Sequence, residues 1–164
     1  MYFKHPTAIV DSESEIGEGT KIWHFSHICA GAKIGKNCSF GQNVYVAPGV
    51  VIGDNVKVQN GVSIYSGVIV GDFCFLGPHC VFTNDKYPRA IGAWTIQSTV
   101  LQKGVSIGAN ATVMCGLILG EYAMVGSGSV VVKDVPAKAL VVGNPARVRR
   151  FFTAQEIESK FGLL

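Results

Sequence analysis

Charged side chains are scarce in this chain of 164 residues: Asp, Glu, Lys and Arg together make up 15% of it, and the formal net charge is +3. Lysine and arginine do not cluster before Arg147, so nucleic acid is not expected as a partner. No uncharged apolar run reaches the roughly 20 residues of a membrane-spanning helix. The first residues, MYFKHPTAIVDSE, lack the apolar core of a secretory signal. These absences exclude nucleic-acid-binding and membrane-spanning proteins from the expected classes.

Paired cysteines are also lacking. The chain has five cysteines, an odd number, and no C-x-x-C motif. This pattern predicts reduced thiols and a cytoplasmic protein without a disulfide framework, and it offers no metal site. Hydrophobic residues make up 48% of the chain, which excludes disorder and is typical of a single folded domain over residues 1–164.

What the sequence does have is a repeat with a period of six residues. From Val10 to Phe82 every sixth residue is large and apolar, and the residue two positions before it is small or β-branched. Two inward positions separated by one variable residue are the pattern of a short strand. Glycine often follows the large residue, where the chain must turn. The large residues are Val10, Ile16, Ile22, Ile28, Ile34, Phe40, Val46, Ile52, Val58, Ile64, Val70, Leu76 and Phe82.

Each unit of six residues therefore predicts one short strand and one tight turn. A strand this short cannot bury its side chains alone, but three units can close a triangular coil of 18 residues that stacks on the next coil, about 4.8 Å away. A period of six does not keep one face of an α-helix, so a helical interpretation fails. The predicted fold is all-β, a parallel β-helix built as a hexapeptide-repeat solenoid.

The units IGEG, IGKN, FGQN, IGDN and LGPH resemble the hexapeptide-repeat acyltransferases, and the resemblance extends over about residues 8–150. It implies a left-handed β-helix, a hand that the spacing does not show and that runs against the usual right-handed crossover. It also implies a homotrimer with active sites between neighbouring subunits. Outward apolar residues such as Val51 and Ile69 indicate a partner surface as well.

The repeat is interrupted once, at VFTNDKYPRA. It stops after Phe82 and resumes at Leu101, which is 19 residues later instead of 18. We therefore expect residues 83–99 to protrude from the coils as a loop. Loops on rigid scaffolds are where binding residues usually lie, so this segment is the first place to search for a site.

The remaining boundaries follow from the repeat. Residues 8–82 and 101–135 are predicted as coils, and residues 136–164 as an extended exit with a short C-terminal helix. Thr153 and Glu156 have the spacing of a capping box, which predicts the start of that helix.

The second half of the chain, from SIGANATVMCG to NPARVRR, resembles the acyl-CoA-binding end of this family. The resemblance implies acetyl-CoA as the donor. Glycines let backbone N–H groups approach a ligand, and basic side chains can bind its phosphates; the alternative is a coil edge followed by a solvated basic tail. The candidate coenzyme-binding residues are Gly108, Asn110, Gly126, Ser127, Lys133, Asn144, Pro145, Arg147 and Arg149.

The blocks KIWHFSHI, GQNVYVAPGV, VQNGVSIYSGV and FTNDKYPRA resemble bacterial N-acetyltransferases that act on UDP- or dTDP-linked 3-amino sugars. Such enzymes serve surface glycan synthesis, including that of lipopolysaccharide. Relatives acting on a 3-amino glucuronate share most of these blocks, but Ser66 and the pair Gly71–Asp72 depart from their pattern. The resemblance implies acetylation of a 3-amino group and leaves the sugar and the nucleotide open.

The residues of the loop favour an amine acceptor. A sugar hydroxyl needs a positioned base, usually His, to attack a thioester, whereas a neutral amine is already nucleophilic. The loop contains Asn84 and Asp85 but no His. By resemblance to the family motif, Asn84 is expected to hold the acceptor amine, and Asp72 or Asp85 to assist as acceptor or base.

Further candidates come from the stacking of residues 18 apart and from the loop. His24, Gln42 and Asn60 fall on one corner, where the alternatives are a structural amide ladder and, for His24, a trimer-interface histidine. Arg89 either binds a diphosphate or carboxylate, or closes a salt bridge within the loop; Trp94 either stacks on a ring or anchors the loop. The candidate substrate-binding residues are His24, Gln42, Gln59, Asn60, Tyr65, Lys86, Arg89 and Trp94.

Three other functions stay open on the sequence. An O-acetyltransferase of the same fold would need a His at the thioester, with His79 and His24 as candidates. A zinc hydratase would bind metal through His residues of adjacent subunits. A non-catalytic scaffold would not bind CoA at all.

Overall fold

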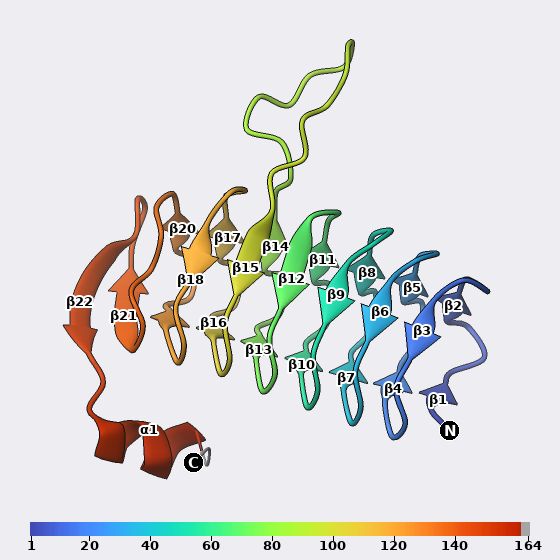
Figure 1. Cartoon of the computed structure of the whole chain (residues 1–164), viewed down its shortest axis with the longest axis horizontal. Helices are drawn as coiled ribbons and strands as arrows, with labels where there is room; N and C mark the ends of the chain where they lie inside the picture. Colours follow the sequence, from blue (N-terminus) through green and yellow to red (C-terminus); the bar gives the residue numbers. More distant parts are fainter. Residues whose placement is uncertain (162–164) are drawn as a thin grey trace.

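The structure is a computed structural model that describes the backbone of residues 1–161 and the side chains of residues 1–159. It confirms the parallel β-helix: strands of two to three residues alternate with tight turns, and every third strand pairs in parallel with its equivalent in the next coil. Three sheets, here called A, B and C, therefore run the length of the stack (Figure 1). The nearly all-β chain carries one short helix at its C-terminal end.

The three sheets differ in length. Sheet A has nine strands, sheet B seven and sheet C six. Sheet A comprises β1 (Phe3–Lys4), β4 (Lys21–Ile22), β7 (Ser39–Phe40), β10 (Lys57–Val58), β13 (Phe75–Leu76), β16 (Ser106–Ile107), β19 (Met124–Val125), β21 (Ala139–Val142) and β22 (Arg147–Phe151). Sheet B comprises β2 (Ile9–Val10), β5 (His27–Ile28), β8 (Tyr45–Val46), β11 (Ser63–Ile64), β14 (Val81–Phe82), β17 (Thr112–Val113) and β20 (Val130–Val131). Sheet C comprises β3 (Glu15–Ile16), β6 (Lys33–Ile34), β9 (Val51–Ile52), β12 (Val68–Val70), β15 (Thr99–Leu101) and β18 (Ile118–Leu119).

The turns between the sheets form three long edges, named here by the sheets that each edge joins. The A–B edge consists of turns 5–8, 23–26, 41–44, 59–62, 77–80, 108–111 and 126–129. The B–C edge consists of turns 11–14, 29–32, 47–50 and 65–67, the loop 83–98, and turn 114–117. The C–A edge consists of turns 17–20, 35–38, 53–56, 71–74, 102–105 and 120–123.

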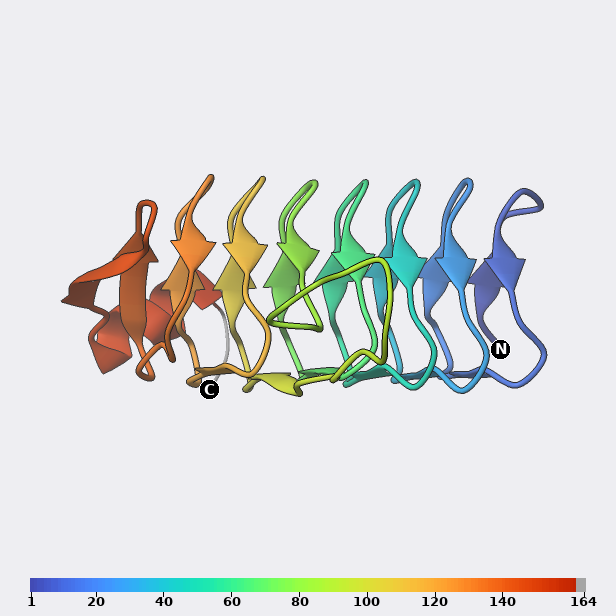
Figure 2. The same ribbon diagram turned by 90° about the horizontal axis from the view of Figure 1, so that it is seen from above.

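The loop enters the stack without disturbing its register. Below it, paired residues are 18 apart, as in Lys21 and Ser39; across it, Val70 pairs with Leu101, 31 positions later. The loop thus adds 31 − 18 = 13 residues to one coil, and it stands away from the B–C edge in Figure 1 and crosses over the coils in Figure 2. Thr99, which the sequence placed in the loop, instead begins β15, because its N–H donates to the carbonyl oxygen of Gly67 (3.0 Å).

The large residues of the six-residue repeat form the core. Ile22, Ile28, Phe40, Ile64 and Leu76 are fully buried, and burying a side chain of this size stabilises the fold by about 1.5–3 kcal/mol. The coils stack so closely at their turns that glycine is required in places. A Cβ on Gly35, for example, would lie 2.5 Å from the carbonyl oxygen of Gly53 in the next coil.

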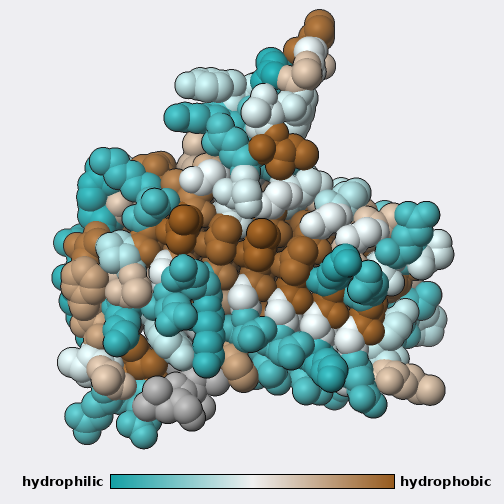
Figure 3. All heavy atoms as spheres, in the orientation of Figure 1, coloured by the Kyte–Doolittle hydropathy of each residue, from teal (hydrophilic) through white to brown (hydrophobic). Residues whose placement is uncertain are grey.

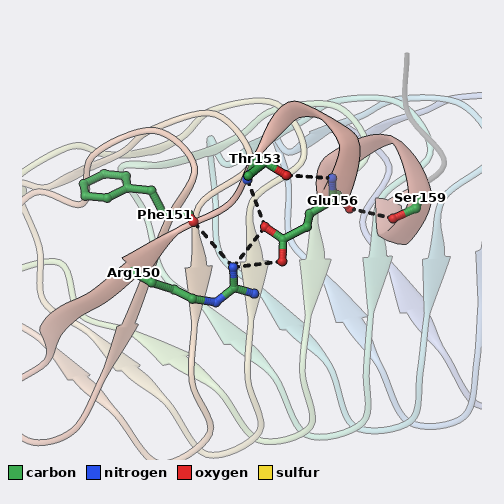
Figure 4. Close-up of polar contacts among 5 residues, drawn as sticks. All are labelled: Arg150, Phe151, Thr153, Glu156 and Ser159. Atoms are coloured by element: carbon green, nitrogen blue, oxygen red, sulfur yellow. Dashed lines mark hydrogen bonds and ion pairs between the residues drawn. The ribbon is translucent and has the colours of Figure 1, made fainter.

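The C-terminal segment closes one end of the stack. Strand β22 pairs antiparallel with β21, and α1 (Ala154–Phe161) follows. The capping box is present: Thr153 Oγ1 accepts from the N–H of Glu156 (3.2 Å), and Glu156 Oε2 accepts from the N–H of Thr153 (2.9 Å) (Figure 4). Arg150 adds an ion pair to Glu156 (2.9 Å), and Ile157 is buried, so the helix is docked.

The outer face of sheet C carries an apolar row, which crosses the molecule in Figure 3. It includes Val51, Ile69 and Ile118, which are 40%, 41% and 50% exposed although water would favour polar residues there. A contiguous exposed apolar row indicates a partner surface. Among the described residues, no helix is long and apolar enough to cross a membrane.

Candidate active site

A cavity of about 250 Å3 lies where the loop leaves the coils. The side chain of Asn84 is half-buried here, and within the described part of the chain it has no hydrogen-bond partner. Its backbone carbonyl oxygen accepts from the N–H of Gln97 (2.9 Å), which ties the two ends of the loop together and fixes the residue. A fixed amide without a partner can bind a ligand amine. The cavity is lined by Tyr65, Thr83, Asn84, Asp85, Pro88 and Trp94.

Asp85 organises the loop from inside. Its side chain is 3% exposed. Oδ1 accepts from the N–H of Tyr87 (2.8 Å), and Oδ2 accepts from the N–H of Thr95 (3.0 Å) and from Nη1 of Arg89 (3.2 Å). The two backbone hydrogen bonds, helped by the Arg89 guanidinium, hold the pKa of Asp85 below its ordinary value although burial opposes them. A carboxylate so fully occupied is a poor proton acceptor, which favours a structural role over the predicted catalytic one.

We expect Asp85→Asn to loosen the loop without affecting the coils. An amide cannot accept at both ends, so the bond to Thr95 or the one to Tyr87 is lost, together with the ion pair to Arg89. Trypsin should then cleave rapidly after Lys86 or Arg89, sites at which we expect slow cleavage in the unmodified protein. The lowered pKa adds a pH dependence: the clamp is present above the ordinary Asp range and is lost as the pH falls below about 4.

Asp72→Asn is the matched control for this experiment, because it makes the same change on another edge. Mass spectrometry of the fragments identifies the cleavage site. If both variants are cleaved in the loop at the same rate, Asp85 is not the clamp.

Other loop residues have partners that bear on their predicted roles. Arg89 also donates to the carbonyl oxygen of Tyr87 (2.7 Å). In this structure Arg89 therefore closes a salt bridge within the loop, which was the alternative to its binding a ligand. Lys86 is exposed, with its ammonium 5.9 Å from the ring centroid of Tyr87. Trp94 lines the cavity and is 53% exposed, which leaves its ring face accessible to a ligand.

A second cavity, of about 390 Å3, lies along the A–B edge. It brings together four of the predicted substrate-binding residues from three consecutive coils. Trp23, which was not among the predicted residues, reaches the cavity from the position before His24. A large aromatic residue at an exposed turn was the available signal in the sequence. The cavity is lined by Trp23, His24, Ser39, Gln42, Gln59 and Asn60.

Part of this polar column is structural. The N–H of Gln42 donates to Oδ1 of Asn60 (2.8 Å), one rung of an amide ladder between coils. The C–A edge has the same ladder with carboxylates: the N–H of Lys36 donates to Asp54 Oδ1 (2.6 Å) and that of Asp54 to Asp72 Oδ1 (2.7 Å). Within one chain Asp72 lies on the C–A edge, and the width of sheet C separates it from Asn84 on the B–C edge. Its role as an assisting acceptor or base stays a prediction.

His24 is held by stacking. Its ring lies 3.6 Å from that of His5, centroid to centroid, and its buried Nδ1 has no hydrogen-bond partner among the described residues. Desolvation lowers the pKa of His5, and the charge of His24 lowers it further. His79, a third histidine of this edge, is exposed and packs over Gly61.

The A–B edge continues into the segment predicted to bind coenzyme. The N–H groups of Gly108 and Gly126 are not available to a ligand, because they donate to the carbonyl oxygens of Val125 and Val141 in the next coil (2.8 Å each). Both glycines are instead needed for close stacking. Asn110, at φ 56°, also donates its N–H within the coils, to the carbonyl oxygen of Pro78.

In turns 108–111 and 126–129 of this edge, two backbone donors remain open. In the first half of the edge the N–H of Gln42 is capped by an Asn60 side chain. Within the described residues, no acceptor serves the equivalent N–H groups of Ala109 and Ser127, which lie above one another, 18 residues apart. Ala109 was not among the predicted residues, because alanine carries no chemical signal in a sequence.

The basic candidates lie near the end of the stack. Lys133 and Arg147 line a third cavity, of about 160 Å3, together with Asp134. Arg149 is exposed on β22. The bond between Asn144 and Pro145 is cis and lies in the turn between β21 and β22, which extends the A–B edge.

Apart from Asp72 on the C–A edge, the main candidates fall on two edges of one chain. Asn84, Tyr65 and Trp94 lie on the B–C edge, whereas the 390 Å3 cavity and the open N–H groups lie on the A–B edge. Sheet B separates the two edges along the whole stack. One chain by itself does not bring the two sets of residues together.

Two family models match the chain. The hexapeptide repeat of succinyl-transferase matches residues 31–66 and 101–133. The bacterial transferase hexapeptide model, with six repeats, matches residues 13–48 and 49–84. Both matches fall on the coils, and neither extends past Asn84 into the loop.

Similar proteins agree with these matches. The dTDP-3-amino-3,6-dideoxy-alpha-D-galactopyranose 3-N-acetyltransferase of Aneurinibacillus thermoaerophilus is 48% identical over 165 residues, which cover 97% of this chain and 83% of that protein. The chloramphenicol acetyltransferase of Klebsiella aerogenes is 46% identical over 61 residues, 37% of this chain and 29% of that protein.

A solved structure extends the likeness of the fold. AntD, an N-acyltransferase from Bacillus cereus in complex with dTDP and 3-hydroxybutyryl-CoA, has a TM-score of 0.64 and 19% identity, covering 97% of this chain and 84% of that chain. At this identity the likeness concerns the coils and their arrangement only.

Proposed function

This chain belongs to the bacterial hexapeptide-repeat transferases, and we propose that it is an acetyl-CoA-dependent N-acetyltransferase for the 3-amino group of a nucleotide-linked sugar. The observation that carries the proposal is the 48% identity, over 97% of the chain, to an enzyme named for that reaction on a dTDP-linked 3-amino sugar. The same relative favours dTDP over UDP as the nucleotide. The unpartnered Asn84 amide at the loop cavity supports an amine acceptor.

The proposed reaction is a direct transfer. The neutral amine attacks the thioester carbonyl carbon, an N–C bond forms, and the C–S bond breaks as CoA leaves and takes up a proton. Asn84 orients the amine through its side-chain oxygen, which accepts an amine hydrogen. Asp85 is occupied within the loop, so the proton released from the nitrogen passes to water rather than to that carboxylate.

The donor is proposed to lie along the A–B edge. The open N–H groups of Ala109 and Ser127 can donate to the carbonyl oxygens of an extended pantetheine arm or to a developing oxyanion. Lys133 and Arg147 lie at the end of the stack, where their charges can bind phosphates. Acetyl-CoA would thus lie parallel to the long axis of the solenoid, with its thioester toward the coil that carries the loop.

A homotrimer completes the proposed site. The apolar row on sheet C supports association, and the separation of the two edges requires that a neighbour supply the missing half. The loop of one subunit would then face the A–B edge of the next. With reduced cysteines throughout the described residues, we place the enzyme in the cytoplasm, where it would supply an acetylated sugar for a surface glycan.

The choice of acceptor is the direct test. With acetyl-CoA and a dTDP-linked 3-amino-3,6-dideoxyhexose we expect release of free thiol, and with the matching 3-hydroxy sugar a rate at least about 10²-fold lower. The rate should rise with pH until the amine is neutral, because only that form attacks. An equal or faster rate with the hydroxyl sugar would establish the O-acetyltransferase alternative, for which His24 and His79 are the candidate bases.

A further inference from the structure

A second group of chemically active side chains lies near the N-terminal end of sheet B, away from the loop. Asp11 follows β2, His27 is on β5, and Cys29 follows β5. Nε2 of His27 is 3.2 Å from Oδ1 of Asp11 and 3.8 Å from Sγ of Cys29. One ligand atom from each residue lies within 4.8 Å of the other two, which is found for no other trio of His, Cys and carboxylate groups in the described residues.

Hydrogen bonds to the His27 ring cannot by themselves bring all three residues together. Both neighbours face the same ring nitrogen, and one imidazole nitrogen offers either a single proton or a single lone pair. If Nε2 donates to Asp11, the thiol of Cys29 has no acceptor on the ring and keeps only the Tyr45 hydroxyl of the next coil as a partner; if it accepts from the thiol, it meets the carboxylate without a proton. A Cys–His–Asp relay is excluded for the same reason, since it would use both nitrogens of the ring.

A metal ion does account for it. Zinc is bound at about 2.0–2.2 Å by nitrogen and oxygen and about 2.3 Å by thiolate sulfur, which places tetrahedral N and O ligands about 3.3 Å apart and N and S ligands about 3.6 Å apart. The separations here are 3.2 and 3.8 Å. The other oxygen of Asp11 accepts from the N–H of Ala30 (3.0 Å), which fixes the carboxylate as such ligands usually require.

We propose that Asp11, His27 and Cys29 bind one divalent ion of the zinc class through Oδ1, Nε2 and Sγ, with water as a fourth ligand. The set of soft thiolate, imidazole and carboxylate suits zinc better than magnesium or calcium. Binding replaces the thiol proton, so one proton is released for each ion bound. The prediction of no metal from the sequence rested on the missing C-x-x-C motif, which this spacing does not use.

The position of the cluster indicates a structural clamp. It joins the first two strands of sheet B, where the core is thinnest: Val10 and Ile16 are only half-buried, whereas Ile22 and Ile28 are fully buried. Cys29 lies three coils from the coil that carries Asn84, or about 14 Å. The ion would hold the terminal coil in place and would take no part in acetyl transfer.

The test uses the full chain, freed of metal with a chelator and titrated with Co2+ and then Zn2+. Co2+ bound to a thiolate absorbs in the near ultraviolet, so we expect this band to saturate at one ion per chain and to disappear when Zn2+ displaces it. Cys29→Ser should abolish the band, and His27→Gln and Asp11→Asn should weaken binding about 10-fold or more. Zn2+ should raise the Tm of the unmodified protein and not that of Cys29→Ser.

Cys115→Ser is the matched control, because Cys115 has the same 7% exposure but is not part of the cluster. It should keep the band, the stoichiometry and the rise in Tm. The proposal is overturned if the unmodified protein shows no thiolate band, or if Cys29→Ser binds Co2+ as the unmodified protein does. It is also overturned if Cys115→Ser alone removes the band.

Discussion

Replacing Asn84 with alanine is expected to lower kcat/KM for the 3-amino sugar by about 10²–10³-fold. The half-buried amide lines the loop cavity and has no partner among the described residues, so its proposed task is to orient the acceptor amine. The loss of one orienting or stabilising hydrogen bond in an active site typically lowers the catalytic rate by a factor of this size. The measurement is thiol release from acetyl-CoA at varied sugar concentration, together with CoA affinity by calorimetry, which should not change.

Two further variants make the result specific to Asn84. Ser98→Ala, an exposed position on the same loop outside the cavity lining, should stay within about twofold of the unmodified enzyme. Asn84→Asp keeps an acceptor oxygen and should lose less than the alanine variant. If Asn84→Ala remains within tenfold of the unmodified enzyme while Ser98→Ala behaves as expected, Asn84 does not hold the amine.

The second large effect is the recovery of activity when two damaged variants are combined. Asn84→Ala damages the loop half of the site, and Ser127→Tyr places a bulky ring on the A–B edge, where the Ser127 side chain is exposed. Each variant alone should be nearly inactive. When the two are co-expressed and assemble at random, a site between subunits is intact only if its loop comes from a Ser127→Tyr subunit and its edge from an Asn84→Ala subunit, so about a quarter of full activity returns.

The outcome separates an intersubunit site from one within a chain. A mixture of Asn84→Ala and Asn84→Gln subunits, both damaged in the loop, should regain nothing. Light scattering of the same samples gives the number of chains. If the Asn84 and Ser127 variants regain no activity although they form mixed trimers, the loop and the A–B edge belong to separate sites.

The β-helix could be predicted from the sequence because its cause is local and repeated. A large apolar residue recurs every six positions, and each one is stabilised by pointing into the core. Ile22, Phe40 and Leu76, for example, are fully buried. The loop could be predicted from the change of phase between Phe82 and Leu101. Its last boundary could not, because Thr99 joins β15 only through its pairing with Val68 in the coil below.

The roles of individual polar residues were less predictable. In the sequence Asp85 is a carboxylate next to Asn84, which suggests a general base. In the structure its oxygens accept hydrogen bonds from Tyr87, Thr95 and Arg89 of its own loop. The N–H groups of Gly108 and Gly126 are likewise used between coils. Hydrogen-bond partners depend on the path of the backbone, which residue types alone do not specify.

The sequence by itself determined the coil, its period, the place of the loop and the resemblance to the hexapeptide-repeat acyltransferases, because hydrophobic spacing and motif identity are properties of neighbouring residues. Only the tertiary structure decided which polar groups are already occupied, such as the carboxylate of Asp85, and which stay open, such as the N–H groups of Ala109 and Ser127. It also brought Asp11 to His27 and Cys29. These relations arise when successive coils stack, and stacking sets residues one coil apart side by side while it separates residues on different edges.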